Sequence, residues 1–134
     1  MNVRSKKINS NITVICSYGN VMFGIMGVFL ENEDTLLIYS EGEFDYIIEG
    51  ISLDEAEDIT DLLQNEPGED TWERYHLDDE SVYDEFENYF GDRESYAQGL
   101  RYIGAIPSNA NVFCDVEGDK VFNRFIRNLI QNLY

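Results

Sequence analysis

The sequence has few of the residues on which most enzyme chemistry depends. Its 134 residues include one histidine, His76, and neither a glycine-rich phosphate loop nor a G-x-G-x-x-G run. One histidine leaves no material for a histidine metal cluster or a Ser-His-Asp set. "DVEGD" (115–119) lacks the rest of a calcium loop, and a carboxylate pair for glycoside hydrolysis carries no information among 27 acids. We therefore expect no catalytic function, no metal and no cofactor.

Cysteines and long hydrophobic runs are also scarce. Cys16 and Cys114 are the only cysteines, and each lies in a short apolar run, which predicts buried free thiols rather than a disulfide. Free thiols in turn predict a cytoplasmic protein. An uncharged run over residues 11–30 follows three basic residues, as in a signal peptide, but polar residues and glycines interrupt it. We therefore expect neither a secretory leader nor a membrane segment.

Positive charge is the scarcest property of the chain. Nine lysines and arginines face 27 acids, which gives a formal net charge of −18. From Glu31 to Glu94 there are 24 acids, and the only bases are Arg74 and Arg93. Such a field repels nucleic acid and anionic lipid and attracts cations. The expected partner is a basic nucleic-acid-binding protein or nuclease, without direct contact to nucleic acid or membrane.

The pattern of apolar residues predicts one α+β domain over residues 1–134. Runs rich in β-branched and aromatic residues, separated by turn signals, predict an N-terminal antiparallel β-meander of about four strands at 12–18, 21–31, 35–40 and 43–50. Acidic helices follow, separated by an ordered loop at 66–80 that Trp72 and Tyr75 would pin. After them we expect a helix from 93 to Gly99 or Gly104, a strand within 106–116, and a C-terminal amphipathic helix at 118–134 that completes the core.

Two of the predicted helices carry an apolar stripe on one side and a row of carboxylates on the other. In "SLDEAEDITDLLQN" (52–65), Ser52 and Glu55 have capping-box spacing, and the acids lie opposite the apolar positions. In "LDDESVYDEFENYF" (77–90), Asp79 is the expected N-cap, and Val82, Phe86, Tyr89 and Phe90 form the stripe. These rows and the edge of the predicted sheet give the expected partner-binding residues: Glu41, Glu43, Asp45, Asp54, Asp58, Asp61, Asp78, Asp79, Glu80, Asp84, Glu85 and Glu87.

The segment "ENYFGDRESYAQGLRYIG" (87–104) resembles part of the ArdA-type antirestriction proteins. The matching positions are Asn88, Tyr89, Tyr96, Leu100 and Gly104, while Ser95, Gln98 and Gly99 depart from the pattern of that family. The resemblance implies a DNA-mimicking inhibitor of restriction enzymes carried by a mobile element.

Charge and resemblance together favour an acidic DNA mimic of the anti-restriction or anti-CRISPR type, encoded by a phage or another mobile element. Neighbouring carboxylates on helices would engage the lysines and arginines that normally contact phosphates. An immunity protein that neutralises a basic nuclease toxin is the alternative. A small ligand-binding domain, or an acidic face that only keeps the protein soluble, also agrees with the composition. A homodimer would extend the charged surface.

Overall fold

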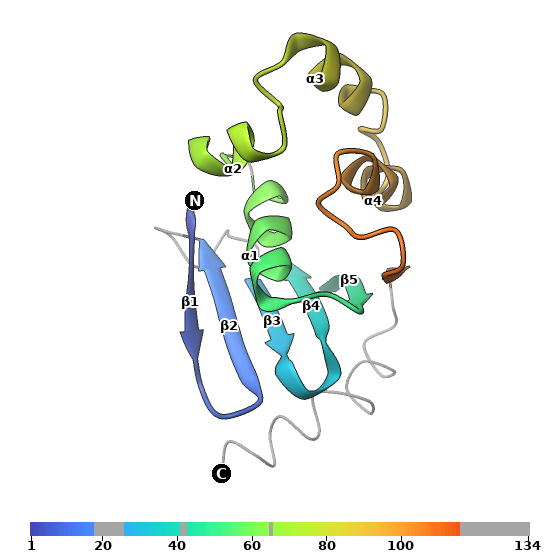
Figure 1. Cartoon of the computed structure of the whole chain (residues 1–134). Coiled ribbons are helices and arrows are strands. Elements are labelled where there is room, and N and C mark those ends of the chain that lie inside the picture. Colours follow the sequence, from blue (N-terminus) through green and yellow to red (C-terminus); the bar gives the residue numbers. More distant parts are fainter. Residues whose placement is uncertain (18–25, 41–42, 65, 116–134) are drawn as a thin grey trace.

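The computed structural model describes residues 1–17, 26–40, 43–64 and 66–115. Within these residues the chain forms an α+β fold, with one antiparallel six-stranded sheet and four α-helices (Figure 1). The strands are β1 (Val3–Lys7), β2 (Ile12–Ser17), β3 (Met26–Leu30), β4 (Thr35–Ser40), β5 (Glu43–Glu49) and β6 (Asn111–Cys114). The helices are α1 (Leu53–Leu62), α2 (Glu69–Arg74), α3 (Glu80–Glu87) and α4 (Arg93–Tyr102), and a 3₁₀ turn spans Glu31–Glu33.

The strands lie side by side in the order β1-β2-β3-β4-β5-β6. Strands β2 to β5 confirm the predicted meander, and β6 confirms the strand expected within 106–116. It pairs with β5, where Cys114 lies opposite Tyr46. Strand β1 was not predicted, because "VRSKK" contains one apolar residue, Val3, and the other four side chains are exposed. It forms because β2 supplies a pairing partner, with Ser5 opposite Ile15.

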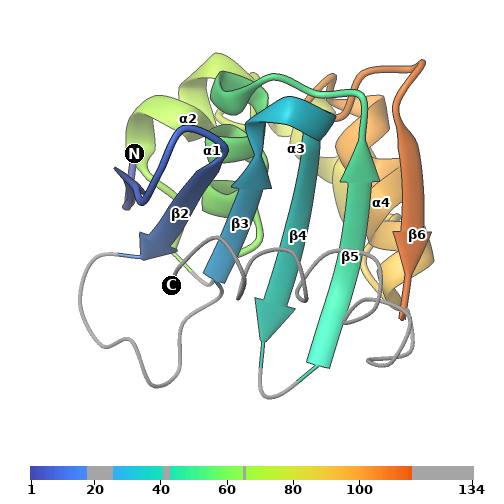
Figure 2. The ribbon, with the colours of Figure 1, turned by 90° about the horizontal axis from the view of Figure 1, so that it is seen from below.

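All four described helices lie on one side of the sheet (Figure 2), where α1 packs on β1, β2 and β3 and α4 packs on β6. The core lies between this face and α1, where alternate strand residues such as Ile15, Leu36 and Ile48 meet Ala56 and Ile59. Helix α1 lies very close to β3 because Gly27 has no side chain: a Cβ there would be 2.8 Å from the Thr60 hydroxyl oxygen. The sheet thereby holds α1 as a rigid base for the other helices.

The opposite face of the sheet carries a second apolar cluster. Its buried members are Ile12, Leu30, Leu37 and Ile47. The helix predicted at 118–134 lies outside the described residues.

The expected helix boundaries are confirmed where a capping residue signalled them. At α1, the Ser52 amide donates to Glu55 Oε1 (2.9 Å) and the Glu55 amide donates to Ser52 Oγ (3.2 Å), which completes the capping box. Asp79 caps α3, and α4 ends before Gly104, whose φ of +87° suits glycine.

The prediction of an ordered loop at 66–80 is wrong for residues 69–74, because these residues form helix α2. No long apolar stripe marks this short segment. Glu69 and Asp70 lie in its first turn and Arg74 in its last, an arrangement that suits the helix dipole.

The close contact between α1 and β3 predicts a cost for any larger residue at position 27. We expect Gly27→Val to lower the free energy of unfolding by about 1–3 kcal/mol, because the added methyl groups would push against Thr60 and Leu36. Urea denaturation measures this value. Gly91→Val is the control, since a Cβ at Gly91 would meet nothing within 4 Å. Equal stability of the two variants would contradict the proposed packing.

Candidate binding surface

The predicted binding carboxylates differ sharply in their surroundings. Glu41 and the side chain of Glu43 lie outside the described residues. Asp45, Asp58 and Asp61 are buried, so the prediction that they form part of an acidic surface is wrong. The exposed predicted residues are Asp54, Asp78, Asp79, Glu80, Asp84, Glu85 and Glu87.

Asp61 is fully buried and holds three segments together. Its Oδ1 accepts from the Asn2 amide (3.0 Å) and from Gln64 Nε2 (2.6 Å), and its Oδ2 accepts from the Gly68 amide (3.1 Å). These bonds join the start of β1 and the segment before α2 to the end of α1. A buried carboxylate requires such donors, because leaving it unpaired in the interior would be very costly.

Asp58 performs a similar task one turn earlier on α1. Its carboxylate accepts from Arg74 Nη1 and from the Tyr75 hydroxyl, both at 2.5 Å. Burial and the bond to Asp58 both raise the pKa of Tyr75, so this phenol remains a donor, and the same carboxylate raises the pKa of Arg74. The end of α2 is therefore tied to α1 by a charge-assisted pair.

Asp45 on β5 also pairs with an arginine, in this case Arg93 at the start of α4. Arg93 Nη2 lies 2.9 Å from Asp45 Oδ1, and Arg93 also pairs with Asp115 after β6. The Tyr46 hydroxyl donates to the Arg93 carbonyl oxygen (3.0 Å), which adds a neutral bond at the start of α4. Helix α4 is thus fixed to β5 and to the end of β6.

The helical periodicity of residues 52–65 wrongly predicted that Asp58 and Asp61 are exposed, because α1 is covered on two sides. Its apolar side faces the sheet, while the start of the chain contacts Asp61 and the end of α2 contacts Asp58, and in Figure 1 both segments lie near the C-terminal end of α1. The sequence did contain a signal for part of this arrangement. The two arginines of the acidic stretch, Arg74 and Arg93, are the partners of Asp58 and Asp45.

Helix α3 and the turn before it carry six of the seven predicted binding carboxylates that are exposed. In Figure 1, α3 is the helix farthest from the sheet. Six carboxylates between residues 78 and 87 are exposed, and within the described part of the chain none of them forms an ion pair. Asp79 serves partly as a cap: it accepts from the Ser81 hydroxyl (2.7 Å) and amide (2.9 Å), and these bonds lower its pKa. This strip, residues 78–87, gathers six exposed acids on an outer helix and the turn before it, and other exposed acids such as Glu69, Asp70 and Glu73 lie on α2.

Close packing on α4 holds the acidic strip in place. Phe86 is buried against Gly99, where a Cβ would lie 2.7 Å from Tyr89 Cβ and 3.0 Å from Phe86 Cε1. The Tyr96 hydroxyl then connects α4 to α1 by donating to the Leu62 carbonyl oxygen (2.9 Å). Burial raises the pKa of Tyr96 to about 12, so this donor persists across the ordinary pH range.

The apolar stripe predicted for this segment is only partly buried. Phe86 is buried as expected, but Phe90 is 45% exposed, although its ring contacts those of Tyr83, Phe86 and Tyr96. Nearby, Tyr89 stacks on Tyr102 of α4, which is 48% exposed. The acidic strip is therefore accompanied by two pairs of partly exposed rings, Tyr83 with Phe90 and Tyr89 with Tyr102, which together are called the aromatic patch here.

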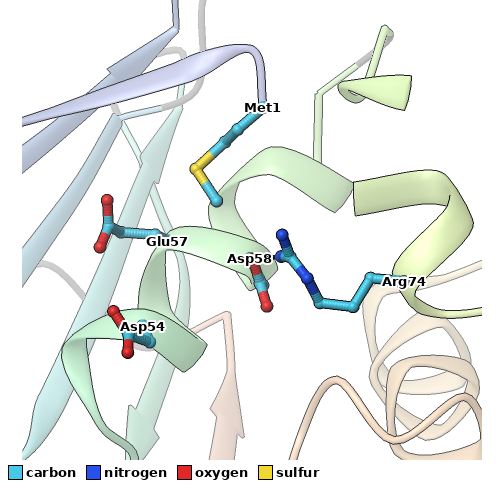
Figure 3. Close-up of a pocket in the computed structure, with 5 residues that line it drawn as sticks. All are labelled: Met1, Asp54, Glu57, Asp58 and Arg74. Atoms are coloured by element: carbon cyan, nitrogen blue, oxygen red, sulfur yellow. Dashed lines mark hydrogen bonds and ion pairs between the residues drawn. The ribbon is translucent and has the colours of Figure 1, made fainter. Parts of the chain in front are cut away.

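A pocket of about 370 Å³ lies beside α1 (Figure 3). It is lined by Met1, Asp54, Glu57, Asp58 and Arg74. Arg74 reaches across it to Asp58, and Glu57 accepts from the Ser5 hydroxyl (2.9 Å), so most of its charged groups already have partners in the chain. Its size suits a small ligand, but Met1 is its one apolar side chain, whereas ligand pockets are mostly apolar.

The remaining chemically active residues form no further site in the described part of the chain. His76 is exposed in a left-handed turn (φ 59°), and no group of three or more His, Cys, Asp or Glu side chains there is arranged to hold a metal ion. Cys16 and Cys114 are free, as predicted, but only partly buried, which corrects the expected full burial. Partial burial still raises the pKa of the Cys114 thiol.

Comparison with protein families, curated proteins and solved structures finds no match to this chain. The resemblance of residues 87–104 to ArdA-type proteins therefore stays a prediction. Among the described helices, none is both long and apolar enough to span a membrane.

The pairing of Asp58 with Arg74 predicts a stability cost when only the arginine is changed. We expect Arg74→Met to lower the free energy of unfolding by about 1–3 kcal/mol, because Asp58 would remain buried with one of its two donors. The double variant Asp58→Asn/Arg74→Met should recover part of this loss, since it removes the unpaired charge. Chemical denaturation measures the free energy of unfolding of the unaltered protein, the single variant and the double variant. Arg4→Met removes an exposed cation from β1 as a control, and an equal loss there would refute the pairing argument.

Proposed function

We propose that this protein is a cytoplasmic acidic inhibitor that binds a basic nucleic-acid-binding protein through the strip of residues 78–87. The observation that carries the proposal is the set of six exposed carboxylates, four on α3, the helix farthest from the sheet, and two just before it, with no ion-pair partner in the described chain. Neighbouring acids on a helix repel one another by a few tenths of a kcal/mol per pair. A cationic partner would relieve this repulsion and gain from the field of a chain with net charge −18.

The charges of the strip are less dense than those of duplex DNA but of the same order. At about 1.5 Å per residue, the eight residues of α3 rise roughly 12 Å and carry four of the six carboxylates, about one per 3 Å. Duplex DNA carries one charge per roughly 1.7 Å of its axis. The strip would replace a short run of phosphates and offer no base edges. A homodimer would be needed to imitate a longer duplex.

The proposed footprint is smaller than the one suggested by the sequence. Asp58 and Asp61 bind groups within the chain, so α1 contributes Asp54 alone of its predicted row. The resemblance to ArdA-type proteins, which covers the end of α3 and all of α4, agrees with an antirestriction role. No catalytic function is proposed.

The alternative function, an immunity protein against a basic nuclease toxin, is favoured by the exposed aromatic patch. Phe90 and Tyr102 expose nearly half of their surface beside the acids. Large aromatic side chains dominate binding at protein interfaces, whereas imitation of a phosphate backbone requires only charge. Such a partner would be held even when its DNA groove is filled.

Affinity capture separates the two functions. The immobilised protein is incubated with bacterial lysate and washed either with stepped salt or with excess duplex DNA. A DNA mimic is expected to retain a nucleic-acid enzyme that both washes release, because DNA competes for the same cationic groove. A single basic protein retained through the DNA wash would instead identify the immunity function. Recovery of no basic protein would contradict both.

Reversal of charge in the acidic strip tests the binding site. With the captured partner, Asp84→Lys/Glu87→Lys should weaken binding by roughly tenfold or more and leave the circular dichroism spectrum unchanged, since both side chains are exposed. Glu33→Lys/Glu66→Lys makes the same change in net charge away from the strip, because Glu33 precedes β4 and Glu66 precedes α2. If both double variants weaken binding equally, the site assignment is wrong and only the overall charge matters.

A further inference from the structure

The rings of the aromatic patch contact one another and the buried ring of Phe86. The ring of Phe90 meets those of Phe86 and Tyr83 edge to face, with centroids 5.1 Å and 6.3 Å away. Tyr102 stacks on Tyr89 at 5.8 Å with an interplanar angle of 28°. Despite these contacts, Phe90 and Tyr102 leave 45% and 48% of their surface exposed. Side chains fixed in this way lose little conformational entropy when a partner binds.

The carboxylates and rings alternate along one side of α3. Glu80, Tyr83 and Glu87 follow one another at i, i+3 and i+7, which places them on one helix face. Phe90 continues this line just beyond the helix, where its ring contacts Tyr83. Tyr83 is half-buried and also contacts Trp72, so the open ring of this row is that of Phe90, where a flat cation would meet the ring three residues after Glu87.

We infer that the acidic strip and the aromatic patch together recognise arginine side chains of a basic partner, in preference to lysine. This inference rests on the proposed function and names the chemistry of its partner. A guanidinium binds a carboxylate through two parallel N–H groups while its flat face stacks on an aromatic ring. An ammonium has no flat face, so it gains less from contact with the rings than a guanidinium does.

Charge complementarity identifies the occupant of this surface as a cationic protein segment. Glu80 and Glu87 share a face of α3 with Tyr83, Asp84 follows Tyr83 in the chain, and none of these three acids has an ion-pair partner among the described residues. A second copy of the chain would bring the same acids against them, and anionic lipid would be repelled for the same reason. A segment rich in arginine satisfies both the acids and the rings.

The test compares an oligo-arginine peptide with an oligo-lysine peptide of equal length, each titrated calorimetrically into the protein at about 150 mM salt. We expect the arginine peptide to bind roughly threefold to tenfold more tightly, because stacking adds to a charge attraction that both peptides share. Phe90→Leu and Tyr102→Leu should each reduce this preference. Phe113→Leu is the matched control: Phe113 is 46% exposed, but it lies on β6 and should not affect the preference.

Equal affinity of the unaltered protein for the two peptides would overturn the arginine inference and leave the proposed acidic surface intact. The effect of Asp84→Lys/Glu87→Lys on both peptides tests that surface separately. Self-association abolished by Phe90→Leu would also overturn the inference, because a second copy would then be the occupant. If a leucine variant does not fold, proton NMR of the unaltered protein decides: the arginine peptide must shift the ring signals of Phe90 and Tyr102 more than the lysine peptide does.

Discussion

The arrangement of this protein depends on how three buried carboxylates find donors in a chain with little positive charge. Asp45 and Asp58 take the two arginines of the acidic stretch, and Asp61 takes backbone and side-chain amides. Each pairing joins segments that are distant in the sequence: β5 to α4, α1 to α2, and α1 to the start of β1. Because an unpaired buried carboxylate is very costly, these three sites also determine where the helices can lie.

Both arginines of the acidic stretch pair with carboxylates outside α3, and no acid of α3 forms an ion pair among the described residues. Helix α3 contacts the rest of the molecule mainly through Phe86 and its neighbours on α4, and its other side faces solvent. Exposed charge thus collects on an outer helix that is fixed at its base by Gly99. The same packing leaves the rings of Phe90 and Tyr102 partly uncovered, so charge and aromatic surface occur together.

This combination limits the kinds of partner that suit the surface. Carboxylates alone would attract any cation with strong dependence on salt, and they would discriminate poorly. Rings fixed beside them add area and a preference for flat groups. A partner that presents arginines in a groove for nucleic acid fits both properties. The pocket beside α1 fits such a role less well, because its arginine and one of its acids already bind each other.

The sequence by itself determined the elements whose signals are local. Runs of β-branched and aromatic residues between turn signals predicted β2 to β5, the Ser52 and Glu55 spacing predicted the start of α1, and Asp79 predicted the start of α3. Only the tertiary structure decided which carboxylates remain outside. A helical wheel places Asp58 and Asp61 opposite the apolar side of α1, but it contains no information about the second layer, in which Arg74, Tyr75 and Gly68 cover them. Burial of a charge depends on contacts between distant segments, and those contacts exist only once the chain has folded.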